Sequence, residues 1–456
     1  FDSVARTFPV FACTGLELAH NQYGTGTITD PHYICTGTQL NGLAQTTADY
    51  NKYYIQMANI DMSGVNGGTD HNIIGTDINA FTGTYDGGGF TISNWDRTTA
   101  ATNYVGMFGV VEGDGGVDGV GDGRITNVHL RNISMDGTDY IGGLVGDLRN
   151  AAIVTLSSTH GTIATTEADA DYVGGLVGNS NVGTTISASW TSVDVTSTGA
   201  TAQWTGGAIG RALGTTITKV FARGSVKGMD FTGGLAGAVQ NGSVLSSSYA
   251  SGNVHGNTRQ GGLVGRLRNS TIEYSFSTGY VHGDSDSTGG LVGNTNNGTG
   301  NINFSWSTSN VNGKLYVGGL VGIRNANNLN INDSYATGDV VGVNFVGGLV
   351  GRTEDASGSL TINRSYTRTN VRATDASCIA GGFFGELDSE TTDGMLNISD
   401  SYSTGYVYCN NLVGGFFGQI DMTNGLGGLS IVRSYSAAYP MGTGTVDPFS
   451  ASDLGI

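Results

Sequence analysis

The sequence predicts an all-β chain folded as a β-solenoid (a β-helix) of about eleven glycine-rich coils with an N-terminal cap. The first observation behind this prediction is a repeated box of two glycines, two apolar residues and a third glycine, as in YVGGLVG at 172–178. Its first glycine recurs every 27 to 34 residues, at positions 142, 174, 206, 233, 261, 289, 318, 347, 381 and 414. The second observation is composition, since 77 of the 456 residues are glycine and only 12% are charged.

Each glycine box is followed by a second element with an aromatic residue, a Ser/Thr-Gly turn and a valine, as in EYSFSTGYVHG at 273–283. The two elements give about three short strands per repeat, separated by polar turns. Repeats of this length indicate solenoids, propellers or arrays, but a propeller blade needs four strands and a leucine-rich repeat needs an Asn/Leu pattern that is missing. Coils stacked about 4.8 Å apart would make a rod section roughly 50 Å long.

Three parts are expected along the chain. Residues 1–103 should form an N-terminal cap and the first irregular coils, residues 104–437 the regular solenoid, and residues 438–456 a C-terminal tail. Within the first part, Thr38 to Ala44 are expected to form a short capping helix, because an open strand edge at the end of a solenoid invites aggregation.

The glycine box predicts two rows of apolar side chains. If GGLVG is one strand, neighbouring residues point to opposite faces. The leucines are then expected in the core: Leu144, Leu176, Leu263, Leu291, Leu320 and Leu349. The following residues would form an outer apolar stripe for a partner or a neighbouring subunit: Val145, Val177, Val264, Val292, Val321, Val350, Phe384 and Phe417. Turn geometry that breaks the alternation would bury this second row instead.

The charge of the chain excludes several classes of partner. The formal net charge is −17, and no cluster of Lys and Arg exists that could replace the counterions of nucleic acid. The same deficit argues against an anionic membrane surface. No run of 18 apolar residues occurs, so no membrane span is expected.

The four cysteines predict two disulfides. Cys378 and Cys409 lie three and five residues before successive glycine pairs, so they occupy near-equivalent places on adjacent coils. Adjacent coils bring equivalent Cα atoms to about 5 Å, which suits a disulfide. Cys13 and Cys35 are expected to form the other pair. Disulfides are typical of oxidising compartments, and we therefore expect an extracellular or cell-surface location.

Candidate chemistry is sparse. Asp114, Asp118 and Asp122 lie in the glycine-rich stretch GDGGVDGVGDGR and are weak calcium candidates, although a solvated insertion is the simpler interpretation. No other cofactor is expected. No nucleophile elbow, phosphate-binding loop or Ser/His/Asp arrangement appears, so the chain is not expected to be an enzyme.

Aromatic residues recur in the second element of nine repeats. They predict either core packing in an aromatic ladder or a strip on which sugars stack: Trp190, Phe221, Tyr249, Phe276, Trp306, Tyr335, Tyr366, Tyr402 and Tyr435.

The repeats at 104–437, and the lead-in ICTGTQLNGLA at 34–44, resemble the GLUG motif, a glycine-rich repeat of bacterial secreted and cell-surface proteins. The resemblance implies an adhesin-like role. GLUG repeats also occur in some bacterial peptidases that cleave immunoglobulin A through a zinc HExxH motif. None of the seven histidines here is followed by glutamate, so that activity is not implied.

The function expected from these observations is that of a non-enzymatic structural or adhesive protein, either a surface adhesin or the repeating subunit of an extracellular fibre. Its partners would be copies of itself, joined through segments such as 1–12 and 439–456, or host and surface glycans or proteins. The alternative is a carbohydrate-binding or polysaccharide-degrading β-helix protein. An ice-binding face would need a strict TxT repeat, which the sequence lacks.

Overall fold

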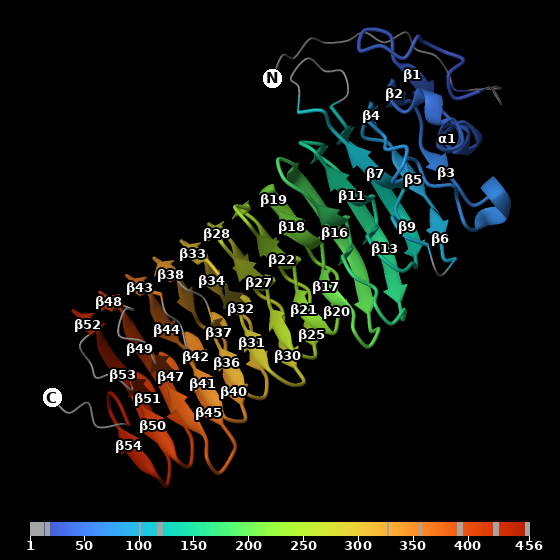
Figure 1. The fold of residues 1–456 in the computed structure, drawn as a ribbon. Helices are drawn as coiled ribbons and strands as arrows, with labels where there is room; N and C mark the ends of the chain where they lie inside the picture. The colour runs from blue at the N-terminus through green and yellow to red at the C-terminus, as the bar shows by residue number, and fades with distance from the viewer. Residues whose placement is uncertain are drawn as a thin grey trace.

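The chain forms an elongated parallel β-solenoid of about 12 turns, with 54% strand and 4% helix, and the predicted fold class is confirmed (Figure 1). This architecture comes from a computed structural model. The structure describes Cys13 and residues 19–99, 102–115, 122–325, 328–354, 358–389, 395–422 and 428–451.

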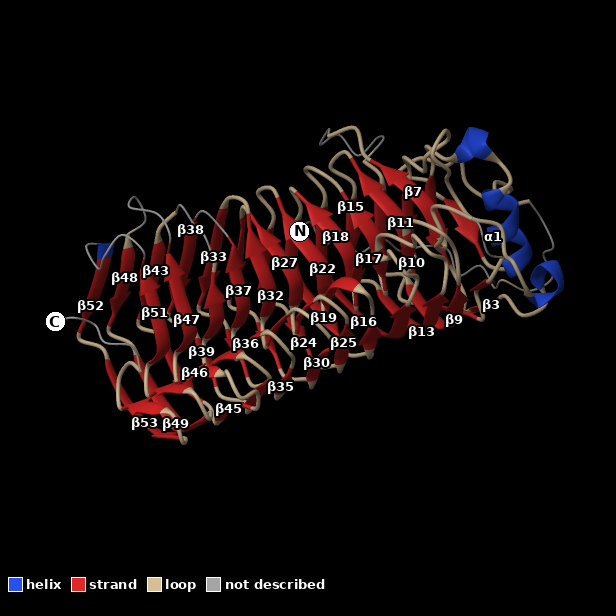
Figure 2. Cartoon of the chain, turned by 60° about the horizontal axis from the view of Figure 1, so that its bottom comes forward, coloured by secondary structure: helices blue, strands red, loops and turns tan. Residues whose placement is uncertain are grey.

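Three parallel sheets run along the rod, as Figure 2 shows from a second side. The valine sheet has 11 strands, from β7 (Phe108–Glu112) to β51 (Phe417–Met422). The glycine-pair sheet also has 11 strands, from β10 (Ile141–Gly142) to β54 (Thr445–Asp447). The broad sheet holds the other 32 strands and begins at β1 (His32–Ile34).

One coil illustrates the path of the chain. It passes through β27 (Val264–Arg268) in the valine sheet, then β28 (Ser270–Glu273), β29 (Phe276–Ser277) and β30 (Val281–Gly283) in the broad sheet, and β31 (Ser287–Gly289) in the glycine-pair sheet. Each strand pairs in register with its equivalent in the next coil, so identical positions form ladders.

The glycine box is a corner, not a continuous strand. Gly290 and Leu291 form a bend between β31 and β32 (Val292–Asn296), and the chain passes there from the glycine-pair sheet to the valine sheet. A Cβ on Gly290 would lie 2.0 Å from the carbonyl oxygen of Gly319, so only glycine permits this backbone approach.

Because the chain turns at this corner, both apolar residues of the box point inward. The predicted leucine row is confirmed in the core at 0% exposure. The predicted outer stripe is wrong, because the bend breaks the alternation and leaves each of its members at 0% exposure as well: Val145, Val177, Val264, Val292, Val321, Val350, Phe384 and Phe417.

A second break in alternation occurs in the broad sheet. Tyr274 has a left-handed backbone (φ 50°), and both Glu273 and Tyr274 face outward before Ser275 returns to the interior. This extra outward residue inverts the pattern, so Phe276 lies on the outer surface. Equivalent residues in other coils share the conformation: Ser247, Phe304, Asp333, Arg364, Asp400 and Arg433.

Serines at this break form a buried column between coils. The backbone N–H of Ser275 donates to Oγ of Ser305 at 3.1 Å, and the N–H of Ser305 donates to Oγ of Ser334 at 3.2 Å. Each hydroxyl also donates within its own coil, as from Ser305 to the carbonyl of Asn303 at 2.8 Å. These bonds satisfy polar groups that the left-handed residue would otherwise leave unpaired in the core.

The N-terminal end carries the predicted capping helix. Helix α1 (Gly37–Ala44) begins after Thr36, whose side chain accepts from the N–H of Gln39 in a capping box. Leu40 and Leu43 on its inner face are fully buried and join the main core. The helix therefore covers the end of the apolar interior.

The expected C-terminal tail is largely part of the solenoid. Strand β53 (Tyr435–Met441) pairs with β49 (Tyr402–Tyr408), and β54 pairs with β50 (Leu412–Gly414). Residues 438–451 thus complete the last coil rather than forming a free linker, because their backbone continues the existing ladders. The linker segment 1–12 lies outside the described residues.

Candidate functional site

Eight of the predicted aromatic residues form a stacked column on the outer surface, which we call the outer aromatic column. Neighbouring ring centroids are 4.6 to 5.7 Å apart and their planes differ by 3 to 25°. The members are Phe221, Tyr249, Phe276, Trp306, Tyr335, Tyr366, Tyr402 and Tyr435, and Trp190 pairs in backbone register with Phe221.

The stacking decides what this column can bind. Each inner ring has both faces covered by its neighbours, and only the ring edges reach the surface. A sugar that stacks on an aromatic side chain needs an open ring face, which the inner rings of the column do not offer. The arrangement therefore supports the aromatic-ladder interpretation, placed outside the core rather than within it.

A second column stands beside the glycine-pair sheet in the earlier coils. Its members are Tyr104, Tyr140, Tyr172, Trp204 and Phe231, with centroids 4.6 to 6.2 Å apart. The guanidinium of Arg211 lies 4.3 Å from the ring centroid of Tyr172 and 5.6 Å from that of Trp204. Cations over aromatic rings stabilise such contacts modestly at exposed positions.

Two carboxylates next to this column have perturbed acidity. The N–H of Asp171 donates to Oδ1 of Asp139 at 2.9 Å, and the N–H of Gln203 donates to Oδ1 of Asp171 at 2.8 Å. Burial raises the pKa of Asp139, and burial together with the charge of Asp139 raises the pKa of Asp171 to about 6. Both carboxylates hold the backbone of the next coil, which is a structural task.

Two further acidic groups lie under arginines. Asp147 is 2% exposed and accepts hydrogen bonds from Arg149 Nε at 2.5 Å and Asn179 Nδ2 at 2.7 Å. Burial raises the pKa of Asp147, although the charge of Arg149 lowers it. Burial likewise raises the pKa of Glu386 to about 7, although Arg352 Nε lies 2.5 Å away. A raised pKa can mark an acid-base catalyst, but both carboxylates are covered and engaged by their partners.

Both predicted disulfides are present. Cys13 pairs with Cys35 at a Cα–Cα distance of 5.6 Å, and Cys378 pairs with Cys409 at 5.9 Å. The second disulfide joins adjacent coils, as the repeat spacing predicts, and lies in an apolar cluster with Val346.

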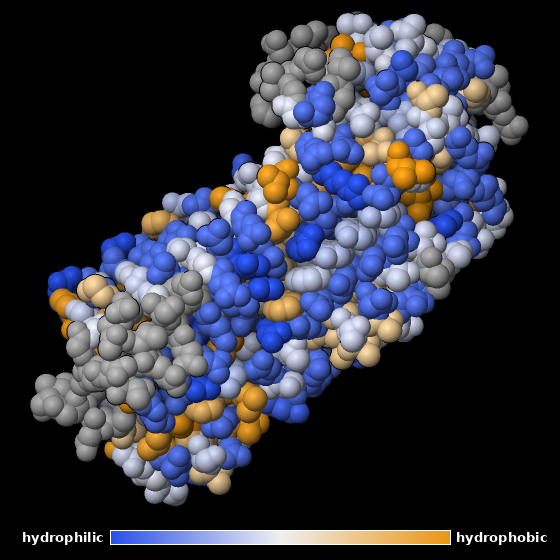
Figure 3. Space-filling view, in the orientation of Figure 1, coloured by the Kyte–Doolittle hydropathy of each residue, from blue (hydrophilic) through white to orange (hydrophobic). Residues whose placement is uncertain are grey.

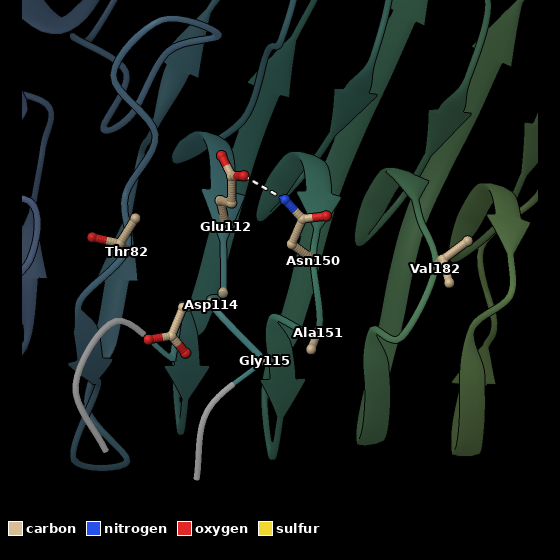
Figure 4. Close-up of a pocket in the computed structure, with 8 residues that line it drawn as sticks. Thr82, Glu112, Asp114, Gly115, Asn150, Ala151 and Val182 are labelled. Carbon is tan, nitrogen blue, oxygen red and sulfur yellow. Dashed lines mark hydrogen bonds between the residues drawn. The ribbon is translucent and has the colours of Figure 1, made fainter. Parts of the chain in front are cut away.

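The structure describes two of the three calcium candidates, Asp114 and Asp122. Asp114 lines an open hollow of about 700 Å³ together with Glu112, whose carboxylate accepts from Asn150 at 2.5 Å (Figure 4). Asp122 lines a different hollow, of about 370 Å³. Asp118 lies outside the described residues. In the described part of the chain, Asp114 and Asp122 belong to no group of three metal-ligating side chains.

The structure brings together one cluster that the sequence interpretation missed. His255, His282 and Asp284 place one ligand atom each within 4.8 Å of one another. The signal was available, because VHG recurs at 254–256 and 281–283, one coil apart. Residues separated by one coil are neighbours in register, as the pairing of His255 with His282 shows.

The surface is mainly hydrophilic on the face shown in Figure 3, where apolar side chains lie in separate groups. This agrees with the burial of the valine row. Among the described residues, no helix is long and apolar enough to cross a membrane.

Comparisons with known proteins give local and weak similarities. No family model matches the chain. Halomucin of Haloquadratum walsbyi is 31% identical over 138 residues, which is 29% of this chain and 1% of Halomucin. A solved structure of a candidate immunoglobulin A1 protease from Bacteroides ovatus aligns with 93% of this chain and 85% of that chain, at 15% identity and a TM-score of 0.20. A likeness at that level does not extend to fold or function.

Proposed function

We propose that this chain is an extracellular structural or adhesive protein, either a surface adhesin or the repeating subunit of an extracellular fibre, and that it is not an enzyme. The observation that carries the proposal is the long parallel stack itself. In-register ladders, the serine column and the outer aromatic column all connect each coil to the next. Such a rod holds its two ends at a fixed separation, which suits a spacer or a fibre subunit.

An extracellular location is supported by two disulfides, since these persist in oxidising compartments. The resemblance of the repeats to the GLUG motif of secreted and surface proteins points the same way. The local similarity to a protein named Halomucin is in line with this placement.

The partners that we propose are copies of the chain, or glycans and proteins of a surface, and not nucleic acid. Five arginines are paired with carboxylates: Arg149, Arg259, Arg352, Arg364 and Arg433. Phosphate binding would have to displace these ion pairs on a chain of net charge −17.

The alternative, a carbohydrate-binding or carbohydrate-degrading protein, has less support. The rings of the outer aromatic column present edges rather than open faces, and the perturbed carboxylates Asp147 and Glu386 are buried under arginines. Both features favour a structural role over sugar stacking or acid-base catalysis.

Negative-stain imaging of native material tests the proposal directly. Filaments with an axial repeat close to the length of one rod would identify a fibre subunit. Isolated rods that bind to glycans or proteins in an array would identify an adhesin. Depolymerisation of any polysaccharide in an activity screen would contradict the proposal and favour the alternative.

A further inference from the structure

The cluster of His255, His282 and Asp284 lies on the outer side of the broad sheet, on two adjacent coils. His255 belongs to β25 (Val254–Gly256), His282 belongs to β30, and Asp284 follows β30 directly. The carboxylate lies between the two rings, with Oδ2 2.7 Å from Nε2 of His255 and Oδ1 3.2 Å from Nε2 of His282. Each oxygen of the carboxylate therefore faces a different imidazole.

The side chains are open to solvent but held in place. Their exposed fractions are 42% for His255, 35% for His282 and 50% for Asp284, so an ion can reach them from water. The two rings are 4.9 Å apart in an edge-to-face arrangement, since the backbone pairs His255 with His282. Nδ1 of His282 is covered and has no partner among the described residues, which leaves Nε2 as the nitrogen that can bind an ion.

This donor set suits a divalent transition metal. Two imidazoles and one carboxylate favour zinc and its neighbours over calcium or magnesium, which take oxygen ligands. Zinc bonds of about 2.0 to 2.2 Å in tetrahedral geometry require ligand atoms roughly 3.3 Å apart. The distance from Nε2 of His282 to the carboxylate, 3.2 Å, already matches that separation, whereas the distance from Nε2 of His255, 2.7 Å, must lengthen by about 0.6 Å, so side-chain shifts of well under 1 Å would admit the ion.

The geometry points to a binding site for one zinc-like divalent ion at His255, His282 and Asp284, with water completing the coordination. The ion joins two coils, because His255 comes from one and the other two ligands come from the next. The bound ion would act as a removable cross-link between these two coils. This inference does not depend on the function proposed above.

A residue in a neighbouring coil provides a second, independent test of the metal site. Lys227 precedes His255 in the same ladder, and Asn312 follows His282. The ammonium of Lys227 adds a positive charge next to the cation site, so its removal should strengthen metal binding.

Calorimetric titration of the metal-stripped protein with Zn²⁺ tests the inference, with Co²⁺ absorption as a report on coordination geometry. We expect one ion per chain, and an affinity at least about tenfold weaker in each of His255→Asn, His282→Asn and Asp284→Asn. Lys227→Gln should bind more tightly. The exposed His160, which lies outside the cluster, provides the matched control His160→Asn, whose affinity should equal that of the wild type.

The inference is overturned if Zn²⁺ shows no saturable binding up to about 1 mM, the limit of weak specific affinity. It is also overturned if the three ligand variants bind as the wild type does, or if His160→Asn loses as much affinity as they do. The substituted side chains are at least one-third exposed, and circular dichroism would verify that the variants keep their strands.

Discussion

Val292 offers a direct test of the corner at the glycine box. This side chain is 0% exposed, as is its neighbour Leu291, although simple strand alternation places Val292 on the outer surface. The perturbation is Val292→Ala, with Val292→Asp as a stronger variant. The matched control is Val182, which lies in a turn and is 66% exposed.

The expected cost follows from burial. Val292→Ala removes the equivalent of two methylene groups, worth about 1.6 kcal/mol at about 0.8 kcal/mol each. The cavity left behind adds about 1 kcal/mol when the surroundings relax only in part. The total is about 2 to 3 kcal/mol, whereas an exposed valine should cost less than about 0.5 kcal/mol. Val292→Asp should cost more than Val292→Ala, because it buries a carboxylate without a partner.

Hydrogen exchange is the suitable assay. A long repeat array can unfold in parts, so a single global free energy of unfolding is not well defined. Exchange rates of amides in residues 288–296 report the local opening free energy of this coil and its neighbours. We expect a loss of about 2 to 3 kcal/mol there in Val292→Ala and no measurable loss in Val182→Ala.

Equal exchange in Val292→Ala and Val182→Ala would refute the corner. It would mean that Val292 loses no buried contacts on truncation and that the stripe predicted from alternation is exposed after all.

Three further predictions concern the links between coils. Loss of the Cys378–Cys409 disulfide in the double alanine variant should reduce the local opening free energy of its two coils by about 3 to 4 kcal/mol, as expected for a sequence separation of 31. Hydrogen exchange measures this loss, and reductant should cause no further loss of protection in these two coils of the variant, because the remaining Cys13–Cys35 disulfide lies in the N-terminal part of the chain. Burial raises the pKa of Asp171 from 3.8 to about 6, so its contribution to stability is complete below about pH 3.8 and is lost as the pH rises through 6. Asp171→Asn should therefore flatten the dependence of stability on pH between pH 4 and 7.5. An unchanged dependence would contradict the raised pKa. Tyr335→Ala should reduce the local opening free energy of its coil by about 1 to 3 kcal/mol through its two ring neighbours at 5.7 and 4.8 Å, while Tyr335→Phe should be nearly neutral, both measured by hydrogen exchange.

The repeat made the stacking of coils predictable, because register follows from spacing alone. Cys378 and Cys409 could be paired from their distances to successive glycine pairs, and their disulfide is present. The same arithmetic applied to the two VHG segments would have placed His255 beside His282. Zinc motifs of short local spacing do not reveal that cluster, because a solenoid brings together residues one coil apart.

The direction in which each side chain points could not be predicted from alternation. Alternation assumes an unbroken strand, and each coil breaks it twice. The bend at Gly290 turns Val292 inward, and the left-handed backbone of Tyr274 turns Phe276 outward. Tyrosine does not favour positive φ, so composition gives no warning of the second break. The serine that follows the left-handed residue in each of these coils, as Ser275 follows Tyr274, is the mark of this second break.

That serine column gives the rod a direction. The N–H of Ser275 donates to Ser305 and the N–H of Ser305 donates to Ser334, so each bond points to the following coil. The parallel strands run in one common direction as well. One end of such a stack differs from the other in the groups that it offers. Copies joined end to end can extend the pattern only head to tail, since a two-fold junction would set like groups against each other. A fibre built from this chain would therefore be vectorial, with two distinguishable ends and growth that need not be equal at both.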